Sequence, residues 1–249
     1  MDNTCTMKET APFGFSHRTV LLAAFKYSVP VLLGYATIGI AFGLLLSGAG
    51  YPWWLTLVMS LWMYAGAAQF IAAGLFVAGT TVWEACLIQL VVNARHIAYG
   101  FSMLKRFGDS GFFKPYLIFS LTDETFALLS SLPDNTGPYG DDREKRRLFM
   151  FYVALLDQCY WVCGSVIGAV AGTLIPFDMK GIGFALTALF IVLMIEQIQK
   201  VKRPELFVVS GAAALLGVFL LPGSLSLLAA LTFALLLSSL VLRKGRAKS

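Results

Sequence analysis

Apolar residues fill most of the chain in long runs that are separated by short polar stretches. The runs lie at about residues 27–48, 53–79, 82–104, 115–132, 148–174, 181–198, 206–221 and 224–242. Because a helix needs about 20 apolar residues to cross a bilayer, this pattern predicts eight transmembrane helices. We therefore expect an all-α integral membrane protein in which residues 1–249 form a single transmembrane domain.

One predicted crossing is ambiguous. Residues 82–107 end in Lys-Arg-Phe at 105–107, which the positive-inside rule places in the cytoplasm, whereas eight full crossings place it outside. A broken or re-entrant segment here would leave seven crossings. The expected fold is a polytopic bundle of about seven to eight transmembrane helices, with residues 82–107 as the candidate for a break.

Composition supports a membrane location. The chain is 58% hydrophobic and 13% charged, and its mean hydropathy is +0.75, whereas soluble domains are about 45–50% apolar. No short apolar core with a cleavage site follows the N-terminus, so we expect no removable signal peptide. The net charge of +5 comes from basic residues at the ends of apolar runs, and no aromatic-basic segment suggests a nucleic-acid partner.

The basic residues also predict an orientation, with both termini in the cytoplasm. Residues 1–20 then form a cytoplasmic N-terminal segment, and residues 243–249 form a basic cytoplasmic tail. Only four basic residues fall outside in this topology: Lys105, Arg106, Lys114 and Lys180.

A weak internal repeat links two distant runs. The segments IGIAFGL at 38–44 and IGAVAGT at 167–173 share a G-xxx-G spacing, which lets helix backbones approach closely. The spacing is common in transmembrane helices, so it indicates either ordinary helix packing or a duplication. Two related halves would place a binding site at their interface.

Several polar side chains interrupt the apolar runs and are the candidates for function. They are Gln69, Asn93, Arg95, His96, Asp123, Glu124 and Asp157. An Asp or Arg at a helix centre costs about 2.5–3.5 kcal/mol on insertion scales, so these groups must be paired, hydrated or protonated. Arg95 can pair with an acid on another helix or contact an anion. Gln69 and Asn93 can join helices or contact a ligand.

Each ionisable candidate has a structural and a functional interpretation. His96 can be a neutral hydrogen-bonded imidazole between helices or a group that titrates near neutral pH. Asp157 can be functional, or it can be a snorkelling or cavity-facing residue near its helix end. Asp123 or Glu124 can carry a coupling proton inside the bundle, or they can have a structural role. No nucleophile with an adjacent base and no metal-ligand spacing is visible, so we expect no enzyme, no metal and no cofactor.

Three separated segments resemble a known family. YAGAAQF at 64–70, NARHIAYG at 93–100 and LTDETFAL at 121–128 are similar to signature segments of the AzlC family, the large membrane subunits of branched-chain amino acid exporters. The resemblance implies a transporter of the bacterial plasma membrane that exports leucine, isoleucine, valine and methionine with a small AzlD-type membrane subunit. No P-loop is present, so we expect a gradient-driven transporter without a nucleotide-binding subunit.

A zwitterionic substrate with an apolar side chain needs a donor, an acceptor and an apolar wall. We expect Arg95 or the N-terminus of a broken helix at the carboxylate, with Gln69, Asn93 or Asp123 at the ammonium. Tyr64 is a further candidate for substrate binding. The apolar wall is assigned to Phe42, Trp62, Phe70 and Phe126.

Proton antiport is the expected coupling, carried by Asp123 or Glu124 with His96 and Asp157 as further candidates. Two alternatives stay open. The chain could be a structural or regulatory subunit whose partner carries transport, or it could transport another small amphipathic metabolite.

Overall fold

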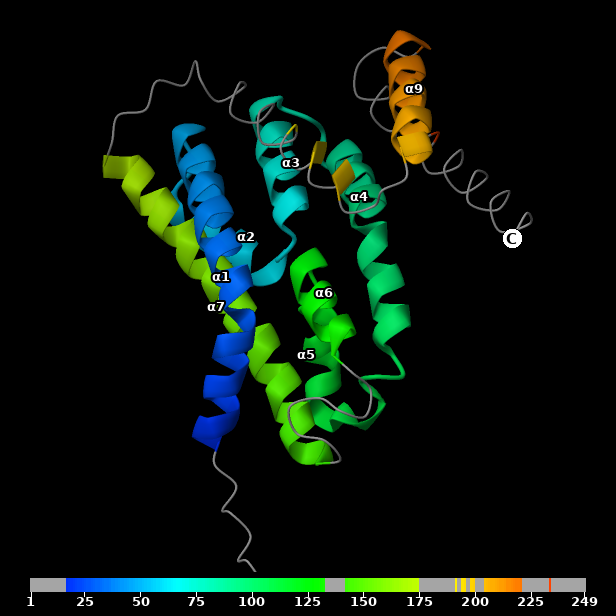
Figure 1. Cartoon of the computed structure of the whole chain (residues 1–249). Helices are drawn as coiled ribbons and strands as arrows, with labels where there is room; N and C mark the ends of the chain where they lie inside the picture. The colour runs from blue at the N-terminus through cyan, green and yellow to red at the C-terminus, as the bar shows by residue number, and fades with distance from the viewer. Residues whose placement is uncertain are drawn as a thin grey trace, which may run out of the picture.

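The computed structural model of the chain describes residues 17–132, 142–174 and 204–220, with a few isolated positions beyond residue 190. All regular structure in these ranges is helical, which confirms the expected all-α class for this part of the chain (Figure 1). The elements are α1 (His17–Gly48), α2 (Trp53–Trp62), α3 (Gly66–Val77), α4 (Val82–Met103), η1 (Gly108–Phe113), α5 (Lys114–Phe119), α6 (Asp123–Ser131), α7 (Arg143–Leu174) and α9 (Pro204–Leu220). The predicted crossings at 181–198 and 224–242 lie outside the described residues.

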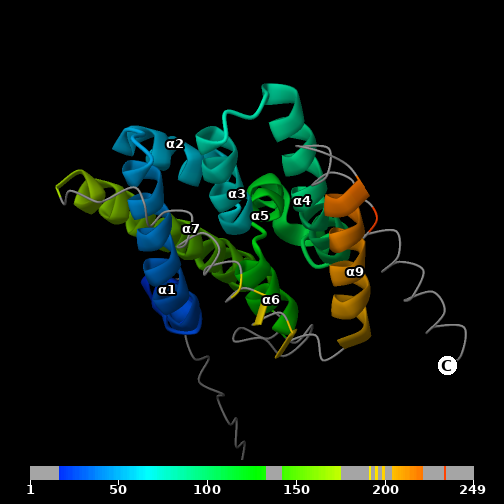
Figure 2. The same cartoon turned by 90° about the horizontal axis from the view of Figure 1, so that it is seen from above.

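Helices α1 and α7 form the framework of the molecule. Each has 32 residues, a length of about 48 Å that exceeds the thickness of a bilayer core. Within the described residues, these are the two helices long and apolar enough to cross a membrane. They pack against each other in both views (Figures 1 and 2).

Glycines bring the backbones of α1 and α7 into direct contact. A Cβ atom on Gly39 would lie 3.1 Å from the backbone nitrogen of Ser165, and one on Gly168 would overlap the backbone of Ile40. The two G-xxx-G segments therefore pack against each other, and the predicted close approach is confirmed. An origin by duplication stays a prediction.

Residues 53–77 turn back on themselves instead of crossing once. Helices α2 and α3 contain 10 and 12 residues, so each spans about half of a bilayer core. The Tyr51 ring before α2 lies 5.5 Å from the Phe76 ring near the end of α3. The start and end of this first hairpin are therefore neighbours, and the single crossing predicted at 53–79 is wrong.

The first hairpin reverses at Tyr64. This residue has φ +36°, and it is the non-glycine residue with positive φ in the described part of the chain. Positive φ is uncommon outside glycine because the Cβ atom crowds the backbone. The bend therefore needs support from its surroundings, and the Tyr64 side chain is only 3% exposed.

A second hairpin enters the structure from the other end. It consists of α5, the non-helical residues 120–122 and α6. Arg106, which precedes η1, donates to the carbonyl oxygens of Leu129 and Ser130 at the end of α6, so this segment also returns toward its start. The crossing predicted at 115–132 is thus wrong. The tips of the two hairpins meet, with the Tyr64 and Phe119 rings 6.4 Å apart.

Helix α4 is continuous from Val82 to Met103 and begins with a capping box between Thr81 and Glu84. The continuous helix expected at 82–104 is therefore confirmed, and the alternative of a break is wrong for residues 82–103. The breaks occur in the segments on either side of α4. Each of these apolar runs is long enough for one crossing but contains two short helices.

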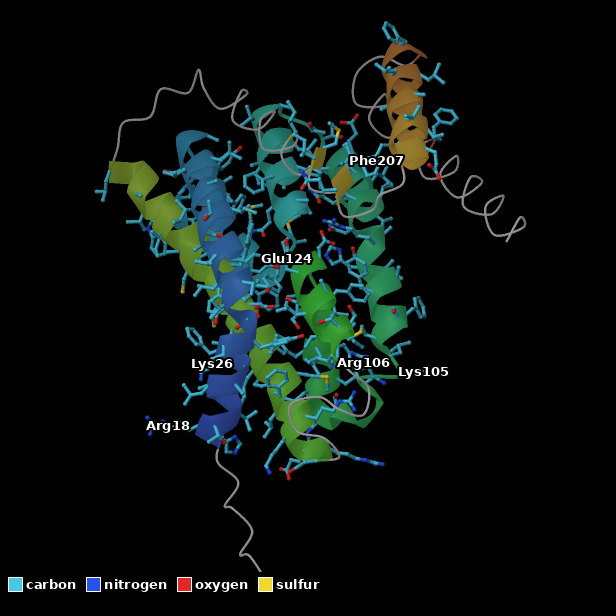
Figure 3. All side chains as sticks on the ribbon, viewed as in Figure 1. Arg18, Lys26, Lys105, Arg106, Glu124 and Phe207 are labelled. Carbon is cyan, nitrogen blue, oxygen red and sulfur yellow. The ribbon has the colours of Figure 1, made fainter. Side chains whose placement is uncertain are left out.

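This arrangement also corrects the predicted positions of Lys105, Arg106 and Lys114. They lie at the end of the molecule where α1 and α7 begin, not at the opposite end. Figure 3 shows Lys105, Arg106 and Arg18 in the same lower part of the structure. The Arg147 guanidinium of α7 lies 5.7 Å from the Phe113 ring beside Lys114. Among the described basic residues, Arg95 alone lies away from this end.

Candidate functional site

A small cavity of about 60 Å³ lies where the two hairpin tips face the long helices. Tyr35 and Ile38 of α1 line it, together with Trp161 of α7, and all three come from the central turns of their helices. A space of this size holds about four ordered waters. The cavity is therefore central in the framework, as in transporters whose sites lie near the bilayer midplane.

The tip of the first hairpin presents an uncapped helix N-terminus to the cavity. Gly66 and Ala67 of α3 line the cavity, the N-cap residue Ala65 makes no side-chain hydrogen bond, and the first turn contains no acid. The first N–H groups of a helix lack intrahelical partners and carry partial positive charge. Tyr64 also lines the cavity, and its buried hydroxyl, which lies near Thr125 and Asp157, makes no hydrogen bond of normal geometry. This side of the cavity is rich in donors.

Gly66 fits this place because Trp161 lies directly over it. A Cβ atom at Gly66 would meet the Trp161 Cη2 atom at 3.1 Å. The Trp161 indole N–H donates to Gln69 Oε1 at 2.8 Å, and Gln69 Nε2 donates to Ser60 at 3.3 Å. The Gln69 amide thus positions one wall of the cavity from behind.

The tip of the second hairpin is capped and acidic. The Thr125 backbone N–H donates to Thr122 Oγ1 at 3.2 Å, and Asp123 and Glu124 occupy the first turn of α6. Thr122, Asp123 and Glu124 all line the cavity. Figure 3 shows Glu124 at the upper end of α6, in the middle of the molecule. This side of the cavity is rich in acceptors.

Asp123 is held by two side chains of α4. Arg95 Nη1 lies 2.5 Å from Asp123 Oδ2, and the Tyr99 hydroxyl donates to Asp123 Oδ1 at 2.6 Å. The structure thus contains the ion pair that was one interpretation of Arg95. Both side chains are about one-third exposed and still line the cavity, and the buried Arg95 Nε has no hydrogen-bond partner.

Glu124 and Asp157 belong to a second polar group. The Tyr35 hydroxyl donates to Glu124 at 2.9 Å, and the Thr125 hydroxyl donates to Asp157 Oδ2 at 2.8 Å. Asp157 is 0% exposed and lies behind the cavity wall rather than on it. The sequence reading missed Tyr35, Thr122 and Thr125, although a threonine before two acids is a recognisable helix start.

Asn93 and His96 lie on α4 near the cavity, in different roles. His96 lines the cavity, and its Nδ1 atom is 3.3 Å from the carbonyl oxygen of Asn93. Asn93 Nδ2 donates to Gln89 at 3.4 Å, and Gln89 donates to the Ala68 carbonyl of α3 at 2.9 Å. These amides join two helices, so direct contact of Asn93 or Gln69 with a substrate stays a prediction.

The apolar wall differs from the expected one. Phe70 lines the cavity with Ile38 and Trp161, and Phe42 supports Phe70 from behind at a ring distance of 5.4 Å. Trp62 is 78% exposed and lies beside a separate surface hollow, so its assignment to the wall is wrong. In the described residues, no group of three or more His, Cys, Asp or Glu side chains could hold a metal ion.

Comparison with known proteins identifies the family. The family model described as AzlC protein matches residues 30–175, a range that contains both hairpins and every cavity residue. The chain belongs to the AzlC family. Among its relatives, the branched-chain amino acid transport protein AzlC of Bacillus subtilis is 37% identical over 183 residues, covering 73% of this chain and 69% of the relative.

Two further relatives of this protein are named as membrane proteins. An uncharacterized membrane protein of Helicobacter pylori strain J99 is 41% identical over 177 residues, which cover 71% of this chain and 75% of the relative. The inner membrane protein YgaZ of Escherichia coli is 30% identical over 214 residues, covering 82% and 83%. No solved structure matches the chain. Together with the apolar composition, these relatives show that this AzlC protein is a membrane protein.

Proposed function

We propose that this AzlC protein exports branched-chain amino acids in exchange for protons, together with a small AzlD-type membrane subunit. The observation that carries the proposal is the opposition of a donor-rich and an acidic hairpin tip across one cavity with an apolar wall. A zwitterion with a branched apolar side chain has the matching arrangement of charges. The name of the B. subtilis relative supports the same substrate class.

The carboxylate is assigned to the tip of the first hairpin. The N-terminus of α3 is uncapped, and helix N-termini bind carboxylates through their free N–H groups and dipole. The Tyr64 hydroxyl and the Arg95 Nε atom are buried donors without partners. Because Asp123 already balances the charge of Arg95, the helix terminus is the stronger candidate, and Arg95 adds a donor.

The ammonium is assigned to the second tip, where Glu124 and Asp123 line the cavity. Glu124 is the acceptor we assign, because Arg95 already balances the charge of Asp123, and the Glu124 carboxylate lines both the cavity and the hollow beside it. The two ends of the substrate would then bridge the two hairpins. Binding would therefore depend on how far apart the tips stand.

Entry requires movement, because the cavity is smaller than a leucine side chain with its zwitterionic end. A second, more open hollow of about 310 Å³ lies between α1 and α6. The two spaces share four lining residues, Tyr35, Ile38, Asp123 and Glu124. The hollow is also lined by Pro30 and Gly34 of α1, which do not line the cavity. Displacement of Tyr35 and Glu124 would join the two spaces, so we propose this side as the route to the site.

The basic end of the structure is proposed to face the cytoplasm. Lys105, Arg106 and Arg18 lie together there (Figure 3), and basic residues are retained on the cytoplasmic side of membranes. The second hairpin would then enter from the cytoplasm and the first from outside. The two tips would meet near the middle of the bilayer.

The test is efflux of preloaded labelled leucine from vesicles under an imposed pH gradient. The chain is compared alone, with the AzlD-type subunit, and with neither, and valine, isoleucine and methionine replace leucine in parallel. We expect gradient-dependent efflux that needs both chains and is abolished by Glu124→Gln. Glu205→Gln in α9 is the matched control, because Glu205 is exposed and lies far along the chain from the cavity residues.

Folded protein that moves none of the four amino acids would overturn the substrate assignment. Efflux that is indifferent to the pH gradient would overturn proton exchange while leaving the substrate intact. Full efflux by the small subunit alone would instead make this chain a structural or regulatory subunit.

A further inference from the structure

Three hydroxyl groups connect the cavity carboxylate Glu124 to the buried carboxylate Asp157. The Tyr35 hydroxyl lies 2.9 Å from Glu124 Oε2 and 2.5 Å from Thr122 Oγ1. Thr122 Oγ1 lies 3.0 Å from Thr125 Oγ1, which lies 2.8 Å from Asp157 Oδ2. The chain is continuous, with every oxygen within hydrogen-bond distance of the next.

The number of protons available to this hydrogen-bonded chain limits the charges of its two carboxyl groups. There are four oxygen–oxygen contacts, but Tyr35, Thr122 and Thr125 each supply only one hydroxyl proton. If both carboxylates were ionised, one contact would contain no proton, and two lone pairs would face each other at hydrogen-bond distance. One carboxyl proton, on either Glu124 or Asp157, completes all four hydrogen bonds.

Once one carboxyl proton is present, the hydrogen bonds of this chain can run in either direction, and each hydroxyl group then donates one and accepts one from its neighbours. Thr122 Oγ1 also accepts the Thr125 backbone N–H at 3.2 Å, which leaves it one further acceptor position and its own proton. It can therefore accept from Tyr35 and donate to Thr125, or accept from Thr125 and donate to Tyr35. The same heavy-atom geometry serves a proton on either carboxyl group.

Asp157 is suited to hold the proton when the cavity acid is charged. It is 0% exposed, its Oδ1 atom has no hydrogen-bond partner, and no cation forms an ion pair with it within the described residues. A buried ionised carboxylate without a cation is strongly disfavoured. Asp123 differs, because Arg95 and Tyr99 both bind it, so it is not the carrier that this geometry favours.

We propose that Glu124, Tyr35, Thr122, Thr125 and Asp157 form a proton relay that couples amine binding to protonation, an inference that rests on the proposed transport function. When Glu124 gives up its proton, each hydroxyl passes its own proton onward and accepts one from behind, and Asp157 Oδ2 receives the last. Four protons each move by one contact, so the net transfer is one proton from Glu124 to Asp157; no electrons are transferred, and the hydroxyl groups end unchanged but reoriented.

The relay lets Glu124 and Asp157 exchange a negative charge inside the protein. Proton transfer to Asp157 leaves Glu124 negative, and the negative carboxylate binds a substrate ammonium group in the cavity. Return of the proton to Glu124 removes that charge and favours release of the amine without replacement, whereas exchange of one leucine for another leaves Glu124 charged and does not use the relay. The ionisable neighbours fixed during this exchange are Arg95, His96 and Asp123 around the cavity, and the hydroxyls of Tyr64, Tyr116 and Tyr160 around Asp157.

The first test interrupts the relay at Thr125, whose side chain does not line the cavity. Thr125→Val keeps the shape and removes the hydroxyl, whereas Thr125→Ser retains the hydroxyl as the matched control. In proteoliposomes with both subunits, we expect leucine counterflow without a gradient to stay within about twofold of wild type in both variants. Leucine-driven proton movement, followed by a pH-sensitive dye, should fall at least tenfold in Thr125→Val and stay near wild type in Thr125→Ser.

Coupled proton movement at the wild-type rate in Thr125→Val, with counterflow intact, would overturn the relay. A loss of counterflow in Thr125→Val would show misfolding or a binding role and would likewise count against it. Equal losses of proton movement in the valine and serine variants would also overturn the role of the hydroxyl.

A second test separates the relay from the transport function. Infrared difference spectra of the purified protein should show the carbonyl stretch of one protonated carboxyl group near neutral pH. Asp157→Asn should remove it, because the asparagine amide supplies the fourth proton and leaves Glu124 ionised, while Glu205→Gln should retain it. An absent band overturns the relay even if leucine is transported; a band that behaves as expected without leucine transport sustains the relay and rejects the substrate.

Discussion

The two hairpin tips share a geometry and differ in chemistry. Both place the N-terminus of a short helix at the same cavity. The α3 terminus follows the sequence Ala65-Gly66-Ala67 and has neither a capping side chain nor an acid. The α6 terminus is capped by Thr122 and carries two acids in its first turn.

This difference shows how one local motif supplies opposite charges. At α6 the acids and the threonine hydroxyl neutralise the partial positive charge of the helix end, so the side chains determine what the tip binds. At α3 nothing neutralises it, and the backbone itself remains available. In the proposed site, a cavity built from both tips would separate an anion-binding side from a cation-binding side without an unpaired arginine or lysine.

The largest loss is expected when the first tip receives an acid like those of the second tip. Ala67→Glu places a carboxylate in the first turn of α3, where it should occupy the helix N-terminus and repel the substrate carboxylate. We expect leucine transport to fall more than tenfold. Ala67→Gln has nearly the same size without the charge and should lose clearly less; equal losses in the two variants would show a steric effect and leave the helix terminus without an assigned role.

A second experiment asks how far Arg95 and Asp123 act as a pair. Arg95→Gln and Asp123→Asn, alone and combined, form a double-mutant cycle. Because both groups are about one-third exposed, we expect a coupling of about 1 kcal/mol, and a melting temperature lower by roughly 2–4 °C in each single variant. Thermal unfolding in detergent measures this. Additive losses in the double variant would show that the 2.5 Å contact contributes no coupling.

The smallest expected change sharpens the assignment of the carboxylate. Tyr64→Phe removes a buried hydroxyl that has no partner, so the melting temperature should stay the same or rise, since burying an unsatisfied hydroxyl costs about 1–3 kcal/mol. Leucine affinity should nevertheless fall about threefold to tenfold, the effect of one modest hydrogen bond. Isoamylamine, which has no carboxylate, should bind equally well before and after the change; a parallel loss for both ligands would place the hydroxyl elsewhere.

Sequence reasoning predicted the chemistry of the site better than its architecture. The cost of charge in a membrane drew attention to Arg95, Asp123, Glu124 and Asp157, and required partners for them. The structure supplies a cation for Asp123 and hydroxyl groups for Glu124 and Asp157. The G-xxx-G spacing likewise predicted a close approach of helix backbones, because missing side chains are visible in sequence, but it did not indicate that the two segments pack against each other.

The hairpins could not be predicted from apolar run length. A run of 25 apolar residues has the same composition whether it crosses a membrane once or turns back halfway, since both forms are buried in the same environment. The bend at Tyr64 uses a tyrosine with positive φ, and no proline or glycine occupies that position. At the second tip a signal was present, because Thr122 before Asp123 and Glu124 is typical of a helix start.

Tyr35 was not predicted as a site residue for a related reason. A tyrosine in an apolar helix reads as an ordinary amphipathic side chain, and its partners Thr122 and Glu124 are 87 and 89 residues away in sequence. Only the packing of α1 beside the second hairpin brings these hydroxyl and carboxylate groups together.

The one-sided placement of basic residues has a consequence for biogenesis. The loop and first hairpin at the opposite end of the framework, residues 49–82, contain no Asp, Glu, Lys or Arg, and Glu84 follows in the first turn of α4. An insertion machinery that threads α1 and the first hairpin into the bilayer therefore need not carry any ionised side chain across the hydrocarbon, where each would be opposed by several kcal/mol. In the proposed orientation, the charges of the second hairpin can remain on the cytoplasmic side, where synthesis occurs, until the tip folds inward. The acidic half of the polar centre would then form as a late step of folding.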